Sequence, residues 1–304
     1  MSTRELTVLG TASQVPTRER AHNALLLRWD GHDLLVDPGE AAQRQLTLAG
    51  LSTARLTTIC ITHDHGDHCF GLPGILQRMA LDGVDHEVDL FFPTEAAEVV
   101  DALVAAAPHA SDPVRRHPVD GPGPVAERHG VRLRSARLRH SRPTLGWRID
   151  EPDGWTLVPE RLERAGVHGP ARARLQRDGS VDVDGRRVHI EDVAVPRPGQ
   201  SVAVVMDTGW CDGALELAEG VDLLVVEATF LSSERERAEE VGHLTAAQAA
   251  GLGAQAGARR VVLTHYSQRY PDLDGHEAEA RIAAPELDLV VARELERVAV
   301  PSRR

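Results

Sequence analysis

Three histidines and two aspartates occupy six consecutive positions within the stretch ITHDHGDHCFGLPGI (61–75). So many imidazoles and carboxylates are costly to bury unless they are paired or bind a ligand. Imidazole nitrogens and carboxylate oxygens are ordinary zinc ligands, and two ions about 3.5–4 Å apart can activate water and stabilise a leaving oxygen. The HxHxDH spacing of His63, His65, Asp67 and His68 presents two imidazoles to one cation and a carboxylate with an imidazole to another. We therefore predict a paired metal site, with a histidine-rich loop of no function as the alternative.

Short apolar runs alternate with helix-like segments along the chain, and these elements must position the cluster. Continuous apolar runs predict buried strands, whereas apolar residues three or four positions apart predict helices. The stretches 108–125 and 150–200 are rich in proline, glycine and charge, which predicts loops. The predicted strands are 5–10, 24–28, 33–37, 57–62, 131–139, 202–206, 222–226 and 260–264, and the predicted helices are 41–49, 74–81, 245–256 and about 276–284.

Histidine or acidic residues recur where the predicted strands end. In open α/β arrangements, functional groups collect at the carboxyl ends of strands, so this recurrence predicts one shared site. Two ions need about three or four protein donors each, which is more than the HxHxDH segment supplies. Three of the strand-end residues are candidates to complete the ligand sets, although each of them alone fits a structural role equally. The strand-end residues are Asp37, His63, His140, Asp207, Glu227 and His265, and the three candidates are His140, Asp207 and His265.

Composition narrows the class of protein. With 304 residues, 42% of them hydrophobic, the chain can bury a sizeable core, and a soluble globular enzyme is the expectation. No run of about 18 apolar residues appears, and the N-terminal MSTRELTVLG lacks the segments of a signal peptide. We therefore predict a cytoplasmic protein without membrane contact. Three widely spaced cysteines, Cys60, Cys69 and Cys211, do not indicate a disulfide framework.

The charge is unevenly distributed. A formal net charge of −12 argues mildly against a polyanionic partner, yet residues 132–148 carry six arginines and no acid. Residues 161–177 carry five arginines against one acid, Glu163. Arginine suits bidentate contacts with phosphate. These basic zones indicate phosphate recognition, with solvated surface as the alternative.

The motifs resemble those of the metallo-β-lactamase fold hydrolases and, within them, the ribonuclease Z family of tRNA 3′-processing endonucleases in its short form. HxHxDH alone identifies the superfamily. The narrower resemblance rests on the GEAAQRQL run, the FGLPG turn and the paired EAT and GHLT segments. It runs through most of the chain: LGTASQVPTRER (9–20), LLVDPGEAAQRQL (34–46), ITHDHGDHCFGLPGIL (61–76), VMDTG (205–209), VEATF (226–230), GHLTAAQAA (242–250) and LTHYSQRY (263–270).

The resemblance implies a complete ligand set for two divalent ions per protomer. Zinc is the expected metal, and manganese suits the same ligands. The implied ligands divide into His63, His65 and His140 for one ion, Asp67, His68 and His265 for the second, and Asp207 bridging both.

Four further roles follow from the resemblance. Asp37 would orient an imidazole from behind the ligands, although a strand-end turn aspartate is an alternative. Asp67 would help to position and deprotonate the attacking water. His243, held by Glu227, would donate a proton to the leaving 3′ oxygen.

The family fold is an α/β architecture, an αββα four-layer sandwich of two mixed β-sheets with flanking helices. We therefore expect residues 1–304 to form one such domain, with an inserted tRNA-gripping arm at 158–190. A mobile surface loop is the alternative for that segment. Arginine in the arm would contact phosphate and make the affinity salt-dependent. The candidate tRNA-binding residues are Arg161, Arg164, Gly169, Pro170, Arg172, Arg174 and Arg177.

The predicted function is metal-dependent cleavage of precursor tRNA, which removes the 3′ trailer and leaves a 3′-hydroxyl on the tRNA. The family also suggests a homodimer. Two alternatives are a hydrolase of a small phosphodiester, sulfate ester or lactone on the same fold, and a non-catalytic RNA-binding protein with structural metals. The sequence departs from the family pattern at Asp64, Val226 and Leu244, where a neutral residue, a histidine and a serine are usual.

Overall fold

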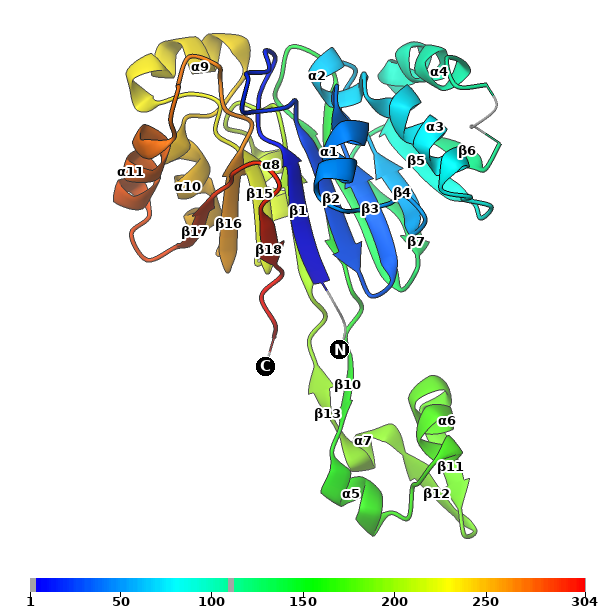
Figure 1. The fold of residues 1–304 in the computed structure, drawn as a ribbon. Helices are drawn as coiled ribbons and strands as arrows, with labels where there is room; N and C mark the ends of the chain where they lie inside the picture. Colours follow the sequence, from blue (N-terminus) through cyan, green and yellow to red (C-terminus); the bar gives the residue numbers. More distant parts are fainter. Residues whose placement is uncertain (1–3, 109–111, 304) are drawn as a thin grey trace. The chain divides into compact units, whose positions relative to one another are not determined.

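The computed structural model describes residues 4–108 and 112–303 (Figure 1). The chain forms two compact units. The larger is built from residues up to Ile149 and from Ser201–Pro301, and the smaller from Asp150–Gln200 with the C-terminal residues from Ser302. No helix within the described ranges is long and apolar enough to cross a membrane.

Two seven-stranded sheets form the frame of the larger unit. The first has the strand order β18-β1-β2-β3-β4-β5-β6 and the second β17-β16-β15-β14-β9-β8-β7. Both are mixed, because antiparallel pairs such as β1–β2 and β7–β8 adjoin parallel runs from β3 to β6 and from β14 to β17. The first sheet contains β1 (Arg4–Gly10), β2 (Ala24–Trp29), β3 (His32–Val36), β4 (Leu56–Cys60), β5 (Val88–Pro93), β6 (Val114–Val119) and β18 (Arg297–Ala299), and the second β7 (Gly123–Arg128), β8 (Val131–Leu138), β9 (Thr144–Asp150), β14 (Ser201–Val205), β15 (Leu223–Glu227), β16 (Arg260–Thr264) and β17 (Asp288–Val291).

Three buried apolar clusters hold the layers of the larger unit together. One lies between the sheets and joins Leu6 and Leu25 of the first sheet to Leu145 and Val225 of the second. The other two lie between each sheet and its own helices, so the order of layers is helix, sheet, sheet, helix. This arrangement confirms the predicted four-layer sandwich. The flanking helices are α1 (Ala42–Leu48), α2 (Gly66–Cys69), α3 (Leu72–Leu81) and α4 (Ala97–Ala105) beside the first sheet, and α8 (Asp212–Ala218), α9 (Arg235–Val241), α10 (Ala246–Gln255) and α11 (Asp274–Ala283) beside the second, with 3-10 turns at Thr94–Ala96 and Ser232–Glu234.

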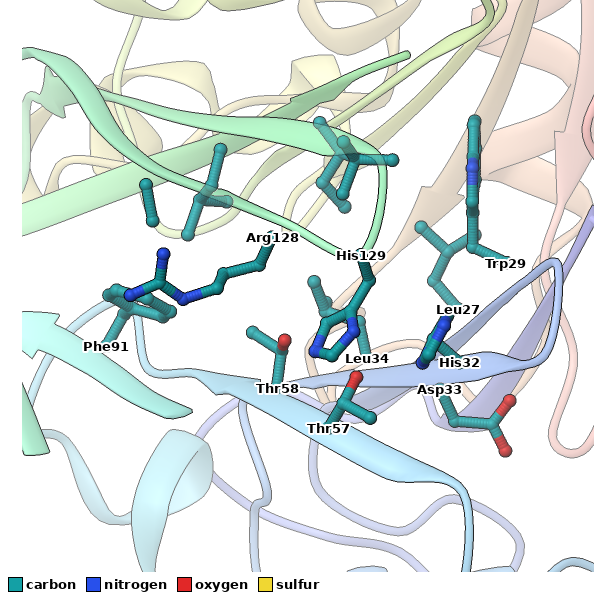
Figure 2. A pocket seen from close by; sticks show the side chains of 14 residues that line it. Leu27, Trp29, His32, Asp33, Leu34, Thr57, Thr58, Phe91, Arg128 and His129 are labelled. Carbon is teal, nitrogen blue, oxygen red and sulfur yellow. The ribbon is translucent and has the colours of Figure 1, made fainter. Parts of the chain in front are cut away.

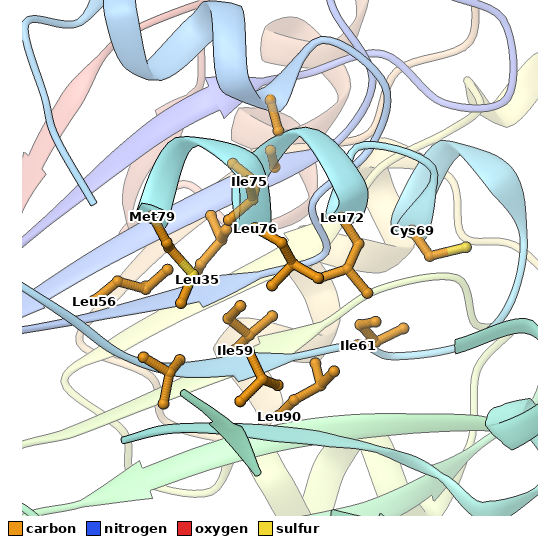
Figure 3. Packing of buried hydrophobic residues seen from close by; sticks show 14 of the residues in the cluster. Leu35, Leu56, Ile59, Ile61, Cys69, Leu72, Ile75, Leu76, Met79 and Leu90 are labelled. Atoms are coloured by element: carbon orange, nitrogen blue, oxygen red, sulfur yellow. The ribbon is translucent and has the colours of Figure 1, made fainter. Parts of the chain in front are cut away.

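Helix α3 shows how the sequence dictates one of these layers. Pro73 stands in its first turn, where the missing N–H has no helical partner to lose. Apolar residues then recur at helical spacing, and Ile75, Leu76 and Met79 are fully buried. Figure 3 shows these three side chains directed towards Ile59 of β4. Each such burial stabilises the fold by about 1.5–3 kcal/mol, so the helix is fixed directly beside the loop that carries the HxHxDH residues.

The predicted elements of the larger unit are confirmed with small shifts at their ends, as in 57–62 against the observed Leu56–Cys60. The loop prediction for 108–125 was wrong, because β6 lies within it and β7 begins there, although residues 109–111 fall outside the described residues. Both are edge strands. The β6 sequence VRRHPV is largely exposed and includes Pro118, which only an edge strand tolerates. An edge strand therefore shows no continuous apolar run from which to predict it.

The smaller unit has its own core, so the loop prediction for 150–200 was also wrong. Leu162, Leu175, Val181 and Val188 are among the apolar residues buried together there. They are separated by long charged stretches, which hides the pattern in the sequence. The elements of this unit are β10 (Gly154–Leu157), α5 (Pro159–Arg164), α6 (Pro170–Asp178), β11 (Ser180–Val183), β12 (Arg186–His189), α7 (Ile190–Val193) and β13 (Ala194–Arg197), with β10 paired to β13 and β11 to β12.

We predict that the buried His276 of α11 makes the native state less stable in acid. Its ring is fully buried and packs edge-on against Tyr266 and Tyr270, with ring centroids 4.9 Å apart in each pair. Burial disfavours the charged ring and lowers the pKa of His276 to about 4. The unfolded chain binds this proton below about pH 6.5 and the folded chain only below about pH 4, so the native state loses stability as the pH falls between these values.

We expect His276→Phe, which retains the aromatic contacts, to lose roughly 3 kcal/mol less stability than the wild type between pH 7 and pH 4. Urea unfolding of both proteins at the two pH values measures this difference. An equal loss in the two proteins would contradict the assignment.

Candidate metal centre

The ends of strands from both sheets bring the predicted metal ligands together. His63 and His65 lie in the loop after β4, and His140, Asp207 and His265 follow β8, β14 and β16. Asp67 and His68 lie in the short helix α2. Three of the predicted site residues have a positive φ although they are not glycine: Asp37 (51°), Asp207 (42°) and His265 (63°). Such backbone costs about 1–3 kcal/mol per residue and tends to cluster at functional sites.

The first donor group consists of His63, His65, His140 and Asp207, whose ligand atoms all lie within 4.8 Å of one another. The Nε2 atoms of His63 and His140 lie 3.6 and 3.7 Å from Asp207 Oδ2. His63 Nε2 is also 3.0 Å from His65 Nδ1. Three imidazole nitrogens therefore surround one carboxylate oxygen, at distances that leave room for one metal ion between them.

The second donor group consists of Asp67, His68, Asp207 and His265. The Nε2 atoms of His68 and His265 lie 3.2 and 3.1 Å from Asp207 Oδ1, and 3.4 and 3.5 Å from Asp67 Oδ2. All four residues are buried. The two oxygens of Asp207 thus face different groups, and this carboxylate is the one donor that the two groups share.

A network behind the imidazoles fixes which nitrogen faces the centre. Asp37 Oδ2 lies 2.8 Å from His68 Nδ1, and because an ionised carboxylate only accepts, His68 Nδ1 carries the proton. Thr62 donates to Asp37 through its backbone N–H (2.7 Å) and its hydroxyl (2.9 Å). The same hydroxyl oxygen lies 3.0 Å from His63 Nδ1, from which it accepts. The Nε2 atoms of His63 and His68 are therefore left to face Asp207.

The other two candidate ligands that face Asp207 through Nε2, His140 and His265, are held in the same manner. His140 Nδ1 donates to the carbonyl of Gly242 at 3.1 Å. His265 Nδ1 lies 3.0 Å from the hydroxyl of Thr229, which itself donates to Glu227. Orientation of a ligand through its second ring nitrogen is the usual arrangement around a bound metal.

The centre fits divalent cations chemically. Asp207 Oδ1 is buried and accepts no hydrogen bond within the described residues, although His68 Nε2 and His265 Nε2 lie 3.2 and 3.1 Å from it. Such an arrangement needs a positive charge. Burial alone would lower the pKa of His68, but the carboxylates of Asp207, Asp67 and Asp37 outweigh burial and raise it well above its usual range. A proton on His68 offsets the negative charge of these carboxylates, as a bound cation would.

Glu227 and His243 form a pair beside this centre. Glu227 is fully buried and accepts from the backbone N–H of Thr208 at 2.7 Å and from His243 Nδ1 at 2.8 Å. His243 Nε2 lies 3.9 Å from Asp207 Oδ2. Burial opposes protonation of His243, but the charges of Glu227 and Asp207 prevail and raise its pKa to about 9. Cations bound at Asp207 would oppose this protonation, and Glu227 would then be the group that favours the protonated form of His243.

A polar cavity of about 240 Å³ opens onto these groups. Both donor groups reach its wall, through His65, His140, Asp67, Asp207 and His265, and His243 lines it as well. Arg237 and Arg269 add positive charge to its lining. Cations held by Asp67 and Asp207 would make the lining positive, which suits an anionic substrate.

Comparisons with known proteins identify the family. Residues 173–266 match a family described as "Beta-lactamase superfamily domain" and residues 4–107 one described as "Anti-Pycsar protein Apyc1". Ribonuclease Z of Salinispora arenicola is 53% identical over 306 residues, covering 100% of this chain and 98% of that protein. Ribonuclease Z of Nocardia farcinica is 51% identical and is matched over 100% of both chains. The chain belongs to the ribonuclease Z family.

Solved structures agree on the fold. Human tRNase Z, short form, superposes with a TM-score of 0.68 at 23% identity, covering 98% of this chain and 99% of that chain. The metallo-β-lactamase fold protein YhfI from Bacillus subtilis superposes with a TM-score of 0.71 at 16% identity, covering 98% and 99%. The predicted fold and family are confirmed, and with them the enzyme class, a metal-dependent nuclease. The fold and the two donor groups of this ribonuclease Z family member support divalent metal binding.

The predicted tRNA-binding residues of this ribonuclease Z family member all lie in the smaller unit. Gly169, with φ of 51°, stands at the start of α6 and Pro170 opens that helix. The arginines have mixed surroundings: Arg161 donates to the Ala194 carbonyl and Arg177 pairs with Asp178, whereas Arg174 is exposed. Arg161, Arg164 and Arg186 line an open groove of about 300 Å³.

Sequence reasoning did not single out the residues that orient the imidazoles of this ribonuclease Z family member, nor Arg186 of the smaller unit, which lines the groove there. Arg186 lies beyond the run of arginines that drew attention to the arm. Thr62 and Thr229 orient imidazoles but have no chemistry that marks them, although each is one or two residues from an acidic or histidine residue that had been singled out. The family departures Val226 and Leu244 are fully buried in the core beneath the site and expose no group to it.

A second pocket does not involve the site. It has a volume of about 40 Å³ and lies between the β2–β3 turn and the β7–β8 hairpin. Figure 2 shows the rings of His32 and His129 at this pocket, where they stack at 4.2 Å, with Arg128 beside Phe91. Its lining is mostly apolar and contains none of the predicted metal ligands.

Proposed function

We propose that this chain is an endoribonuclease that uses two divalent ions to remove the 3′ trailer from precursor tRNA, leaving a 3′-hydroxyl on the tRNA. One observation carries the proposal: the Asp207 carboxylate, shared by two donor groups, lies beside the His243–Glu227 pair in a cavity that Arg237 and Arg269 also line. Family membership supplies the substrate class, because the relatives are named ribonuclease Z and a solved neighbour is a tRNase Z.

Seven residues would hold the ions. We assign His63, His65 and His140 to the first ion, Asp67, His68 and His265 to the second, and Asp207 to both, with zinc as the expected metal and manganese as the alternative. Two ions in this site would lower the pKa of water and offset negative charge on the phosphate.

The remaining steps fall to the protein's own groups. Asp67 lies at the cavity wall and its pKa is held below the usual range, because His68 and His265 outweigh the effect of burial. An ionised carboxylate at this place can accept a hydrogen bond from the attacking water and so position it for the attack. Asp37 and Thr62 keep the imidazoles fixed meanwhile, so little reorganisation is needed as charge develops.

His243 would protonate the leaving oxygen. It lines the cavity, its Nδ1 donates to Glu227, and the charge of Glu227 favours its protonated form. A ribose 3′ oxygen is a poor leaving group, so a donor at this position removes a real barrier.

The smaller unit would bind tRNA, as an arm whose structured part is wider than the predicted 158–190. Arg164, Arg174 and Arg186 supply exposed guanidinium groups there. Guanidinium contacts with phosphate position a nucleic acid without reading its sequence.

We also propose a cytoplasmic homodimer. Family membership suggests this assembly, and Leu48, Phe70 and Leu81 are exposed apolar side chains, at 53%, 60% and 82%, that a partner subunit could cover. Light scattering that gives the mass of one chain at micromolar concentration would refute the dimer.

The direct test of function is incubation of the metal-loaded protein with a precursor tRNA labelled at its 5′ end, followed by mapping of the cut. We expect one cut at the 3′ side of the mature tRNA and a free 3′-hydroxyl on the labelled product. Hydrolysis of bis(p-nitrophenyl) phosphate without cleavage of the precursor would favour a small-molecule hydrolase. Binding of the precursor with neither activity would favour an RNA-binding protein.

Replacement of the proton donor should separate poor leaving groups from good ones. We expect His243→Ala to slow single-turnover cleavage of precursor tRNA by roughly 10² to 10⁴ and to spare bis(p-nitrophenyl) phosphate, whose leaving group is stable as an anion. Glu227→Gln should act in the same direction but less strongly. Metal content is measured alongside, and His86→Ala on the first-sheet side serves as the control. Wild-type cleavage of precursor tRNA by His243→Ala with both ions bound would exclude His243 as the acid.

Arm arginines should govern affinity and not chemistry. For Arg174→Gln with Arg186→Gln we expect the slope of log affinity against log salt for precursor tRNA to fall by about 2, while bis(p-nitrophenyl) phosphate hydrolysis stays unchanged. Arg115→Gln, an exposed arginine on β6, is the matched control. A larger change follows when residues 158–193 are replaced by an Asn-Gly turn, because Leu157 and Ala194 are paired and can be joined by it. Loss of both activities in the arginine variant would mean that the arm is structural.

A further inference from the structure

The three histidines of the first donor group are carried by two separate loops, and these loops must be held at a fixed position relative to each other. His63 and His65 come from the loop after β4, and His140 comes from the loop after β8 in the other sheet. A backbone hydrogen bond from Leu145 N–H to the Thr62 carbonyl (3.0 Å) joins the chain near the base of these loops. Closer to the donors, the link between the two loops is made by side chains.

Asp64 and Arg142 form that link. Arg142 Nε donates to Asp64 Oδ1 at 2.8 Å, and its Nη2 donates to Asp64 Oδ2, so the contact is bidentate. Asp64 stands between His63 and His65 in the chain, and Arg142 stands two residues after His140. The Asp64 side chain is only 6% exposed, although Arg142 is 50% exposed.

This ion pair adds little to the stability of the fold, but its geometry can fix the relative position of the two loops. Ion pairs with one well-exposed partner add little to stability. A bidentate guanidinium–carboxylate contact, however, fixes both the distance and the orientation of the groups that it joins. Here it joins the backbone of the His63–His65 segment to the backbone of the His140 loop.

We propose that Asp64 and Arg142 act as a clamp that positions His65 and His140 for the first ion and so sets the affinity of the first donor group. The inference rests on the two-ion assignment above. It also gives a role to the aspartate at a position where the family pattern has a neutral residue.

A competing explanation makes the opposite prediction for one variant. If the two side chains acted only through their charge, removing the Asp64 carboxylate would weaken cation binding and removing the Arg142 guanidinium would strengthen it. A clamp predicts that either removal weakens binding, and that removing both is no worse than removing one, because a broken link cannot be broken twice.

The test is a double-mutant cycle on Zn²⁺ affinity, using Asp64→Asn, Arg142→Gln and the double variant, titrated with Zn²⁺ against a chromophoric chelator. We expect about a tenfold loss of affinity for one of the two ions in all three variants, the usual scale for a residue that orients metal ligands, with the other ion unaffected. Arg142→Lys keeps the charge but loses the fork, so it should behave like Arg142→Gln. Arg116→Gln, which removes an exposed arginine paired with Asp101, is the control and should bind Zn²⁺ as the wild type does.

Each other outcome has a defined meaning. Opposite effects of the two single variants, cancelling in the double variant, would overturn the clamp, as would wild-type affinity in Arg142→Lys or in both single variants. Equal weakening of both ions would also overturn it. Urea unfolding of each metal-free variant shows whether it is folded. If an Asp64 variant does not fold, the comparison of Arg142→Lys with the wild type still tests the clamp. If the wild type itself binds fewer than two ions, the two-ion assignment fails, which is a different result from failure of the clamp.

Discussion

The carboxylate of Asp207 is the constraint around which the larger unit is arranged. Its two oxygens face two different sets of imidazoles, and Oδ1 is buried without a hydrogen-bond donor in the part of the chain that the structure describes. A buried charge in this state is costly unless positive charge is supplied. Everything that surrounds it, including the left-handed backbone of Asp207 itself, has to be held by the rest of the fold.

The two sheets supply that support. Parallel strands β14, β15 and β16 end at one edge, so Asp207, Glu227 and His265 lie side by side although they are far apart in the sequence. The first sheet brings β4 and the HxHxDH segment, and the core between the sheets fixes the distance between the two halves of the site. Behind the imidazoles, Asp37, Thr62 and Thr229 decide which nitrogen faces inward. The position of the site residues thus depends on the packing between the two sheets.

Much of this could be predicted from the sequence because it is encoded locally. The HxHxDH spacing indicates four candidate metal ligands within six consecutive residues. Apolar runs followed directly by Asp207 or His265 indicate where strands end. What could not be predicted depends on contacts between distant residues. Asp64 and Arg142 are 78 positions apart, and nothing in either neighbourhood indicates the other. The edge strand β6 and the small core of residues 150–200 escaped prediction because exposed or sparsely apolar elements leave no periodic signal.

The shared carboxylate is best tested by anomalous diffraction at the zinc absorption edge from crystals of the zinc-loaded protein. Two strong peaks are expected roughly 3.5–4 Å apart, one on each side of the Asp207 carboxylate, with His63, His65 and His140 around the first and Asp67, His68 and His265 around the second. A single peak, or peaks that do not share Asp207, would contradict the account.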